Sequence, residues 1–184
     1  MGIDQGFVFQ SVKCVRPIWC TTAVLEHHLI QMTLDGTTDT IDQIAVKAGG
    51  GTFVRYVVAW RCGAGVVQQI GLPSTAGEVF AIRRAAASQG LAIETLDPRE
   101  VLAEPRCSAA RAVWALRDRD VDPAMRIAVL SALAEGQMSL DELCAQVPGP
   151  ADPIPAIASL ACAGDIRLDL SASFGPDTPV KIAA

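Results

Sequence analysis

The chain has 184 residues, 51% of them hydrophobic, which is enough to bury the core of one sizeable domain or of a medium domain with a small companion. Fifteen basic residues against twenty acidic ones give a net charge of −5, which excludes a broad phosphate-neutralising surface and leaves room only for local basic patches. No apolar run reaches the roughly 18 residues of a membrane span, and the beginning of the chain lacks the pattern of a signal peptide. We therefore expect a globular, cytoplasmic protein that is not bound to a membrane.

The beginning of the chain predicts an extended arm followed by a helix. Residues 1–18 form the arm, from which Phe7, Phe9 and Val12 are expected to pack on the domain. Apolar residues then recur at three- and four-residue steps over residues 22–34, where a threonine provides the N-cap. This region therefore predicts the first helix.

Three strands are predicted after this helix. The segment 41–46 alternates as a half-buried strand does, and a run of glycines separates it from the next apolar stretch. That stretch, RYVVAWRCGAGVVQQI over residues 55–70, predicts two buried strands joined by a glycine turn.

A second helix and a fourth strand complete the predicted first domain. Thr75 and Glu78 fit a capping box, and the helix that they begin is expected to end at Gly90. Residues 91–96 predict a short strand, and a β–α–β unit this compact pairs its strands in parallel. Residues 1–97 are thus expected to form an α/β domain with a mixed sheet.

The remainder of the chain is predicted to be helical and to end in a small separate domain. Residues 98–121 are expected to be a helical connector, and residues 122–184 are expected to form the domain. Its predicted elements are three helices and a ribbon, beginning at Pro123, at the capping box Ser139–Glu142, at Ile154 and at Ile166. Three helices followed by a two-stranded ribbon are the order of a winged helix.

The layout and a few local strings carry a resemblance to a known family. They are Glu26 on the first helix, the strand 41–46, YVVAW at 56–60 where Y-x-P-D-F is usual, and VVQQIG at 66–71 where a strand ends in E/Q-x-K. Over about residues 15–184 the chain resembles TnsA-type endonuclease subunits of heteromeric transposases, members of the restriction-endonuclease-like PD-(D/E)XK superfamily. The resemblance implies a restriction-endonuclease-like mixed sheet flanked by helices, with a C-terminal winged-helix-like unit.

The resemblance also implies that the nuclease chemistry is missing. Such an enzyme holds Mg²⁺ with several carboxylates and orients the attacking water with a lysine. Under this alignment Ala59 and Gly71 occupy the aspartate and lysine positions. Glu26 and the neutral Gln69 remain as vestigial catalytic candidates, so we expect no metal and no cofactor.

Relocated acids give an alternative. Asp35, Asp39, Asp42 and Lys47 lie near the expected site in the sequence, although a segment rich in Gly and Thr is ordinarily a solvated turn. If such residues took over catalysis, the chain would be a metal-dependent endonuclease with Mg²⁺ as its cofactor. Glu26 itself is also explained as a surface residue of an amphipathic helix.

DNA binding is a second alternative, favoured by arginines. The predicted third helix of the C-terminal domain carries no Arg, Lys, Asn or Gln to read DNA, and residues 98–184 hold eight basic residues against twelve acidic ones. We therefore interpret the winged-helix-like domain as a protein-contact module. The arginines that could line a DNA groove are Arg83, Arg84 and Arg111.

The cysteines and histidines do not predict a metal site. The six cysteines include no C-x-x-C pair, so most are expected to be reduced, buried apolar residues. His27 and His28 are adjacent, which places them on different sides of a helix, and a pair on the helix surface is the expected arrangement.

These observations lead to one functional hypothesis with alternatives. The chain is expected to be a catalytically inactive nuclease-fold protein that acts as an interaction or regulatory subunit with a protein partner, by the resemblance in a mobile-element or prophage nucleoprotein system. The alternatives are a DNA-binding protein, an endonuclease with relocated acids, and a small-molecule sensor with a C-terminal winged helix, for which the sequence offers no pocket chemistry.

Overall fold

The computed structural model describes residues 6–47, 53–71, 75–147 and 152–183, which belong to two compact units. The N-terminal unit comprises residues 1–26 and 37–101, and the C-terminal unit comprises residues 27–36 and 102–184. Most of the segment that the sequence assigns to a helical connector thus belongs to the C-terminal unit. In the described ranges, no helix has the length and apolar character needed to cross a membrane.

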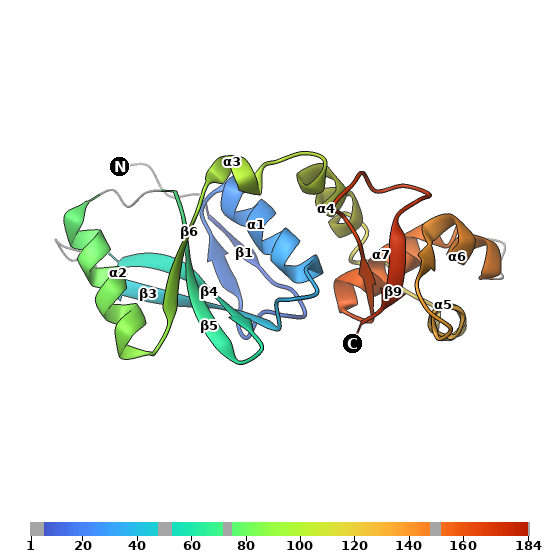
Figure 1. Cartoon of the computed structure of the whole chain (residues 1–184), viewed down its shortest axis with the longest axis horizontal. Coiled ribbons are helices and arrows are strands. Elements are labelled where there is room, and N and C mark those ends of the chain that lie inside the picture. The colour runs from blue at the N-terminus through green and yellow to red at the C-terminus, as the bar shows by residue number, and fades with distance from the viewer. Residues whose placement is uncertain (1–5, 48–52, 72–74, 148–151, 184) are drawn as a thin grey trace. The chain divides into compact units, whose positions relative to one another are not determined.

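A four-stranded mixed sheet forms the centre of the N-terminal unit (Figure 1). Its strands lie in the order β3 (Thr40–Lys47), β4 (Phe53–Arg61), β5 (Ala64–Ile70) and β6 (Ala92–Leu96). Strand β4 pairs antiparallel with both β3 and β5, whereas β5 and β6 pair parallel. The predicted α/β architecture with a mixed sheet is therefore confirmed.

Helix α2 (Ala76–Ser88) covers one face of this sheet, which we call the α2 face. Ile82 of the helix packs in one apolar cluster with side chains from the strands, among them Val58 and Val67. The helix begins as predicted at Thr75, whose side chain accepts a hydrogen bond from the Glu78 N–H. Because side chains alternate along a strand, residues next to Val58 and Val67 in sequence point to the opposite face.

Two short strands that the sequence did not predict lie within the segment expected to be an arm. They are β1 (Phe7–Phe9) and β2 (Ile18–Cys20), which pair antiparallel. Phe9 is buried as predicted, whereas Val12 is 62% exposed and does not pack as expected. Helix α1 (Ala23–Leu34) follows and coincides closely with the predicted first helix.

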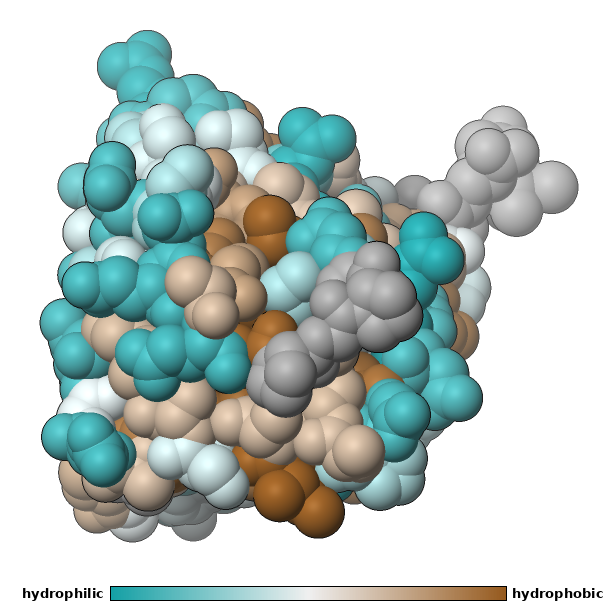
Figure 2. Space-filling model, turned by 90° about the vertical axis from the view of Figure 1, so that its right-hand side faces the viewer, coloured by the Kyte–Doolittle hydropathy of each residue, from teal (hydrophilic) through white to brown (hydrophobic). Residues whose placement is uncertain are grey.

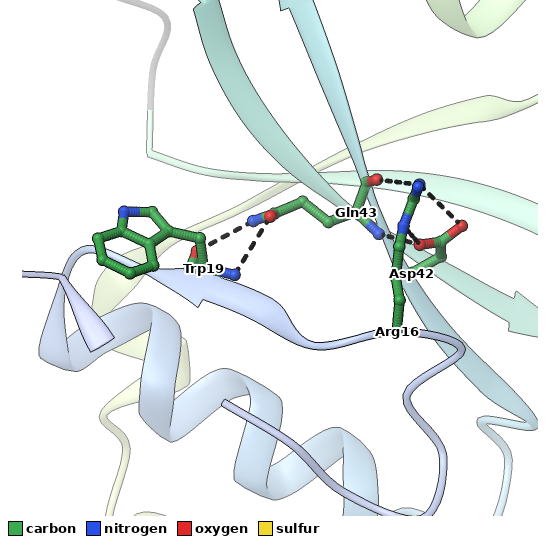
Figure 3. A network of polar contacts seen from close by, with 4 residues as sticks. All are labelled: Arg16, Trp19, Asp42 and Gln43. Atoms are coloured by element: carbon green, nitrogen blue, oxygen red, sulfur yellow. Dashed lines mark hydrogen bonds and ion pairs between the residues drawn. The ribbon is translucent and has the colours of Figure 1, made fainter. Parts of the chain in front are cut away.

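Polar contacts join β2 to the edge strand of the sheet (Figure 3). The side-chain amide of Gln43 on β3 meets both backbone groups of Trp19, since its Oε1 accepts from the N–H at 3.2 Å and its Nε2 donates to the carbonyl at 3.0 Å. Beside it, Arg16 Nε donates to Asp42 Oδ1 at 2.7 Å and a terminal guanidinium nitrogen donates to the Gln43 carbonyl at 2.7 Å. The Gln43 amide thus satisfies the Trp19 peptide groups as a neighbouring strand does.

The predicted turn of the central hairpin adopts a left-handed backbone. Cys62 has φ 49° and Gly63 has φ 78°, the pair of positive values that a two-residue type I′ turn requires. Asp39 stabilises this turn because its carboxylate accepts the Cys62 N–H at 2.6 Å.

The C-terminal unit combines helices with a three-stranded sheet. Its strands are β7 (Met138–Ser139), β8 (Ile166–Leu168) and β9 (Pro179–Ile182), in the order β7-β9-β8 with antiparallel pairing. The helices with residues beyond 101 are α4 (Arg106–Trp114), α5 (Pro123–Leu133), α6 (Leu140–Gln146) and α7 (Ile154–Ala163), while the short α3 (Pro98–Val101) belongs to the N-terminal unit.

The helix starts and the ribbon of this unit lie where the sequence predicts them, and one strand was missed. Ser139 and Glu142 form the predicted capping box, in which Ser139 Oγ accepts the Glu142 N–H at 3.2 Å and Glu142 Oε2 accepts the Ser139 N–H at 2.8 Å. Strand β7 has only two residues, so it carries no alternation of its own. Val129, Leu143 and Ile157 are fully buried in this unit.

One expectation about the histidines is wrong. His28 is only 8% exposed, because residues 28–33 of α1 are all buried and the helix is enclosed rather than amphipathic along this part. The six cysteines are all free thiols. Only three of them, Cys20, Cys107 and Cys162, are buried as predicted, whereas Cys14 and Cys144 are half-buried and Cys62 is exposed.

Candidate functional site

A cleft of about 390 Å³ lies in the N-terminal unit. It is formed by the beginning of β4, the end of β5, the beginning of α1 and the first turn of α2. The parallel strands β5 and β6 both end on this side, and ligands of α/β sheets usually bind outside the carboxyl ends of strands. The residues that line the cleft are Thr21, Thr22, Val24, Leu25, Val54–Val57, Gln68–Ile70, Glu78 and Pro98.

The beginning of α1 supplies backbone donors to one side of the cleft. Thr22 precedes the helix, and its Oγ1 accepts the Leu25 N–H at 3.2 Å while its carbonyl accepts the Glu26 N–H at 3.1 Å. A helix start leaves backbone N–H groups without intrahelical partners and carries partial positive charge. This side of the cleft therefore favours an anionic group.

A hydrogen-bonded pair of side chains lies on the α2 face of the cleft. The Tyr56 hydroxyl donates to Glu78 Oε1 at 2.8 Å. Burial raises the pKa of Tyr56 well above its ordinary value, and the Glu78 carboxylate raises it further. Tyr56 is therefore a neutral hydrogen-bond donor that holds the Glu78 carboxylate in place.

A second polar pair lies on the opposite face of the sheet. Gln68 Nε2 donates to Glu94 Oε2 at 2.8 Å, between residues that are directly opposed on the parallel strands β5 and β6. Gln68 is also opposed to Val57 across β4 and β5. The side chain of Gln68, 3% exposed, is thus enclosed and held by a carboxylate.

The strand register separates the residues that the family alignment brings together. Ala59 is opposed to Val66, so it shares the opposite face with Val57 and Gln68, whereas Gln69 points to the α2 face. Ala59 is fully buried. The structure therefore does not bring Ala59 and Gln69 together on one face, and the glutamine that belongs to the face of Ala59 is Gln68.

The remaining expected site residues lie apart from one another. Gly71 follows β5 with φ +77°, and its N–H donates to the Leu96 carbonyl at 2.9 Å. Glu26 is partly buried on α1 and is not among the described residues that line the cleft. Arg83 and Arg84 are exposed on α2 in the N-terminal unit, and Arg111 is exposed on α4 in the C-terminal unit.

Two acids that were candidates for relocated catalysis have structural partners. Asp39 accepts the Cys62 N–H of the hairpin turn, and Asp42 pairs with Arg16 at 2.7 Å. Within the described parts of the chain, no group of three or more His, Cys, Asp or Glu side chains is arranged to hold a metal ion.

The residues of the cleft that sequence reasoning missed are Arg55, Tyr56, Gln68 and Glu78. Their signal is weak, because Tyr56 and Glu78 are 22 positions apart and Glu78 is explained in the sequence by its place in a capping box. Comparison with known proteins adds no assignment, since neither a protein-family model nor a curated protein matches this chain.

Proposed function

We propose that this chain is a catalytically inactive nuclease-fold protein that acts as an interaction or regulatory subunit. In keeping with its resemblance to transposase endonuclease subunits, its setting is a mobile-element or prophage nucleoprotein system. The observation that carries the proposal is the identity of the side chains on the opposite face of the sheet at the cleft, where a nuclease needs acids and a lysine.

The order of elements supports a restriction-endonuclease-like sheet. A helix, three antiparallel strands, a second helix and a strand parallel to β5 follow one another, and the sheet order is β3-β4-β5-β6. This agrees with the layout that the resemblance implies.

The side chains on the opposite face do not suit the chemistry of that sheet. A hard cation such as Mg²⁺ is held by several carboxylate oxygens, and two ions act together in many phosphodiester displacements. At the cleft the strands instead present Val57, Gln68 and Ile70, and the carboxylate next to them, Glu94, accepts a hydrogen bond from Gln68. These side chains support the loss of catalysis.

The C-terminal unit supports a role in protein contacts. Its order, α5, β7, α6, α7, β8 and β9 with β9 in the middle of the sheet, agrees with a winged helix. In a DNA-reading winged helix the third helix is presented to the major groove. Six consecutive residues of α7, 157–162, are buried instead, so the helix offers little surface to DNA.

The charge and hydropathy of the C-terminal unit also support a role in protein contacts. Residues 27–36 and 102–184 hold seven Lys and Arg against twelve Asp and Glu, so the net charge of −5 resides entirely in this unit. Figure 2 views the end of the molecule that carries α5 and α6, where small groups of apolar side chains lie among hydrophilic ones. A surface of this kind repels phosphate and suits protein contacts.

The N-terminal segment offers a surface for a protein partner. Val8, Val12 and Val15 are 59%, 62% and 64% exposed, and Phe7 near them is also exposed. Exposed apolar residues scattered singly are normal, but four within nine residues favour an interaction surface.

The proposal is tested by assaying metal-dependent cleavage of supercoiled and linear DNA. We expect no cleavage with Mg²⁺ or Mn²⁺ by the purified chain, and no difference between it and Glu26→Ala or Glu94→Ala. Cleavage that either substitution abolishes would mean that acids elsewhere in the chain perform catalysis and would overturn the proposal.

Complex formation is measured with proteins encoded beside this chain, by size-exclusion chromatography with light scattering. We expect a stable complex that is lost in Val8→Asp with Val12→Asp and kept in Ile127→Asp, which changes an exposed apolar residue of the other unit. A monomer with every such protein contradicts the proposal.

The alternative of DNA binding is measured in the same preparation. Duplex affinity at about 50 mM salt that falls steeply as salt is raised, and that Arg83→Gln with Arg84→Gln removes, is the result that favours a DNA-binding protein. We expect no such binding, because acidic residues outnumber basic ones and the net charge is negative.

A further inference from the structure

A second pocket, of about 270 Å³, lies within the C-terminal unit. It is formed by the beginning of α6, the residues at the start of α7 and the loop between β8 and β9. Pockets for small molecules are typically about 300–1,000 Å³ in volume. This pocket is therefore of the size that receives a single side chain or a very small molecule.

Backbone hydrogen bonds hold the loop between β8 and β9 against the beginning of α6. The Leu140 N–H donates to the Thr178 carbonyl at 2.9 Å. The Asp141 N–H donates to the Pro176 carbonyl at 3.0 Å. Within the loop, Thr178 Oγ1 accepts the Gly175 N–H at 2.9 Å. The wall of the pocket is thus held in place before a ligand binds, which lowers the cost of binding.

Most of the described lining of this pocket is apolar. The apolar side chains are Leu140, Cys144, Ile154, Phe174 and Pro176. Aliphatic side chains accommodate the alkyl stem of a long basic side chain. The ring of Phe174, which is half-buried, also attracts a cation that lies over its face.

Two carboxylates give the pocket a negative charge. Asp141 and Asp152 line it, and the described lining includes no Lys, Arg or His. Asp152 Oδ1 accepts the Ile154 N–H at 3.0 Å, and neither carboxylate forms an ion pair with a described residue. Both carboxylates therefore retain the capacity to attract a cation.

The two carboxylates act on the same part of the pocket. Burial raises the pKa of the Cys144 thiol, and Asp152 and Asp141 raise it further. Cys144, which lines the pocket, thus experiences the negative potential of both acids. A cation beside Cys144 is attracted by both carboxylates without having to contact both of them.

We propose that this pocket receives an arginine side chain of the protein partner, an inference that rests on the interaction role proposed above. The guanidinium lies near Asp141 and Asp152. Its alkyl stem lies against Leu140, Ile154 and Phe174. Arginine suits the pocket better than lysine, because a guanidinium is more weakly hydrated than an ammonium and stacks on aromatic rings. Arginine is also enriched among the residues that dominate the energy of protein interfaces.

The charge of the whole unit agrees with a basic partner. Residues 27–36 and 102–184 carry the net charge of −5, so the surroundings of the pocket attract a basic surface as well. The same charge repels phosphate and nucleic acid. A basic protein surface is therefore the occupant that the electrostatics of the unit favour.

The test is a titration of the full chain with n-butylguanidinium, followed by the nuclear magnetic resonance signals of the Leu140, Asp141 and Cys144 amides. N-butylurea is the matched probe, because it has the same alkyl stem and no charge. We expect saturable binding of butylguanidinium below about 10 mM and about three-fold or more weaker binding of butylurea. No shift of these signals, or equal affinity for butylurea, overturns the proposal. Because the titration needs no partner, such a failure counts against the pocket and not against the proposed function.

Substitutions locate the site. Asp141→Asn together with Asp152→Asn is expected to weaken butylguanidinium binding about three-fold or more and to leave butylurea binding unchanged. Asparagine also accepts a hydrogen bond at a helix start, so the start of α7 is retained. The control is Asp120→Asn together with Glu135→Gln, which removes two exposed charges of the same unit outside the described lining and is expected to bind as the parent does. Unchanged binding by the Asp141 and Asp152 variant contradicts the assigned site.

The source of the cation is tested in the complex with the partner. Asp141→Asn together with Asp152→Asn is expected to weaken the complex about three-fold or more, and butylguanidinium is expected to compete with the partner. The control variant is expected to form the complex with nearly the parent's affinity. A complex that the Asp141 and Asp152 variant forms with unchanged affinity would overturn the assignment of the pocket to an arginine of the partner.

Discussion

Two helices of this protein begin with the same sequence pattern, and the glutamate of the pattern is used differently in each unit. In the C-terminal unit the Glu142 side chain accepts a hydrogen bond from the Ser139 N–H and completes a reciprocal capping box. In the N-terminal unit Thr75 caps α2 in the same way, but Glu78 accepts a hydrogen bond from the Tyr56 hydroxyl in the cleft. One motif thus serves the helix in one unit and the cleft in the other.

The two units also differ in where their polar and charged groups lie. The N-terminal unit, whose charges balance, places Arg55, Gln69 and Glu78 around one cavity. The C-terminal unit carries the excess of acids, and six consecutive residues of α7, 157–162, are buried. Polar and charged side chains thus gather at a cleft in the first unit, whereas the second unit carries the net negative charge.

The largest effect is expected from the core of the N-terminal unit. Ile82→Ala removes a side chain that is almost fully buried between α2 and the sheet, and we expect the free energy of unfolding to fall by about 2–5 kcal/mol. Urea denaturation followed by the fluorescence of Trp60, in a chain that keeps only this tryptophan, measures the change.

Leu143→Ala in the core of the C-terminal unit is the matched substitution, with Trp114 as its reporter. If the units are distinct, each substitution lowers mainly the transition of its own tryptophan. Equal shifts of both transitions by either substitution would mean that the two units unfold together, and would contradict the comparison of two distinct units.

A loss of stability at high pH is expected next. Burial raises the pKa of the Cys20 thiol from 9.0 to about 11, so the folded chain keeps this proton where the unfolded chain loses it. The contribution is complete below pH 9 and is lost as the pH rises toward 11, by at most about 2 kcal/mol. Urea midpoints over this range measure the loss.

The control for this pH dependence is Cys20→Ala, which is expected to flatten the decline of the N-terminal transition. Burial raises the pKa of Cys162 in the C-terminal unit to about 12, so Cys162→Ala is expected to flatten the decline of the other transition. A decline that is unchanged in both variants speaks against burial of the two thiols.

A smaller effect is expected from the helix caps. Ser139→Ala removes the two hydrogen bonds of the Ser139 hydroxyl, one from the Glu142 N–H and one to Glu142 Oε2, and we expect a loss of about 1 kcal/mol in the C-terminal transition. Thr75→Ala is expected to cost less, and Ser131→Ala, an exposed change within α5, is the control. A larger cost for Thr75→Ala would contradict the contrast between the two caps.

The smallest effect is expected at the ion pair of Arg16 and Asp42. Arg16→Gln breaks a contact whose arginine is 59% exposed, and exposed pairs contribute roughly 0–1 kcal/mol. Thermal unfolding at low and high salt measures the change, which should vanish at high salt. A salt-independent loss would show that the hydrogen bond to the Gln43 carbonyl is the larger contribution.

The sequence predicted the sheet of the N-terminal unit and the helices of the C-terminal unit because their signals are local. Alternation marks β3, apolar runs around a glycine turn mark β4 and β5, capping boxes mark α2 and α6, and a proline marks the start of α5. Strands β1, β2 and β7 have two or three residues each and are defined only by their partners, so periodicity cannot reveal them. His28 was expected on the surface, because the apolar spacing of a helix indicates one buried side. It does not show whether the fold also covers the other sides of the helix.

The site was less predictable, for a reason of register. The sequence places Gln68 and Gln69 next to each other, but only the pairing of Val57 with Gln68 shows which of them shares a face with Ala59. The pair of Tyr56 and Glu78 depends on α2 packing on the sheet, which no local pattern encodes. Arg55 has no sequence signal at all beyond its charge.

The central claim, that the cleft is not a metal-dependent nuclease site, is tested most directly by nuclear magnetic resonance with Mn²⁺. Substoichiometric Mn²⁺ broadens the amide signals of residues near a bound ion, and no DNA substrate is needed. We predict no selective broadening at Val57, Gln68 and Glu94. Selective broadening of these signals and of the Glu26 signal, with the broadening lost in Glu26→Ala, would contradict the account and show that the cleft binds a metal ion.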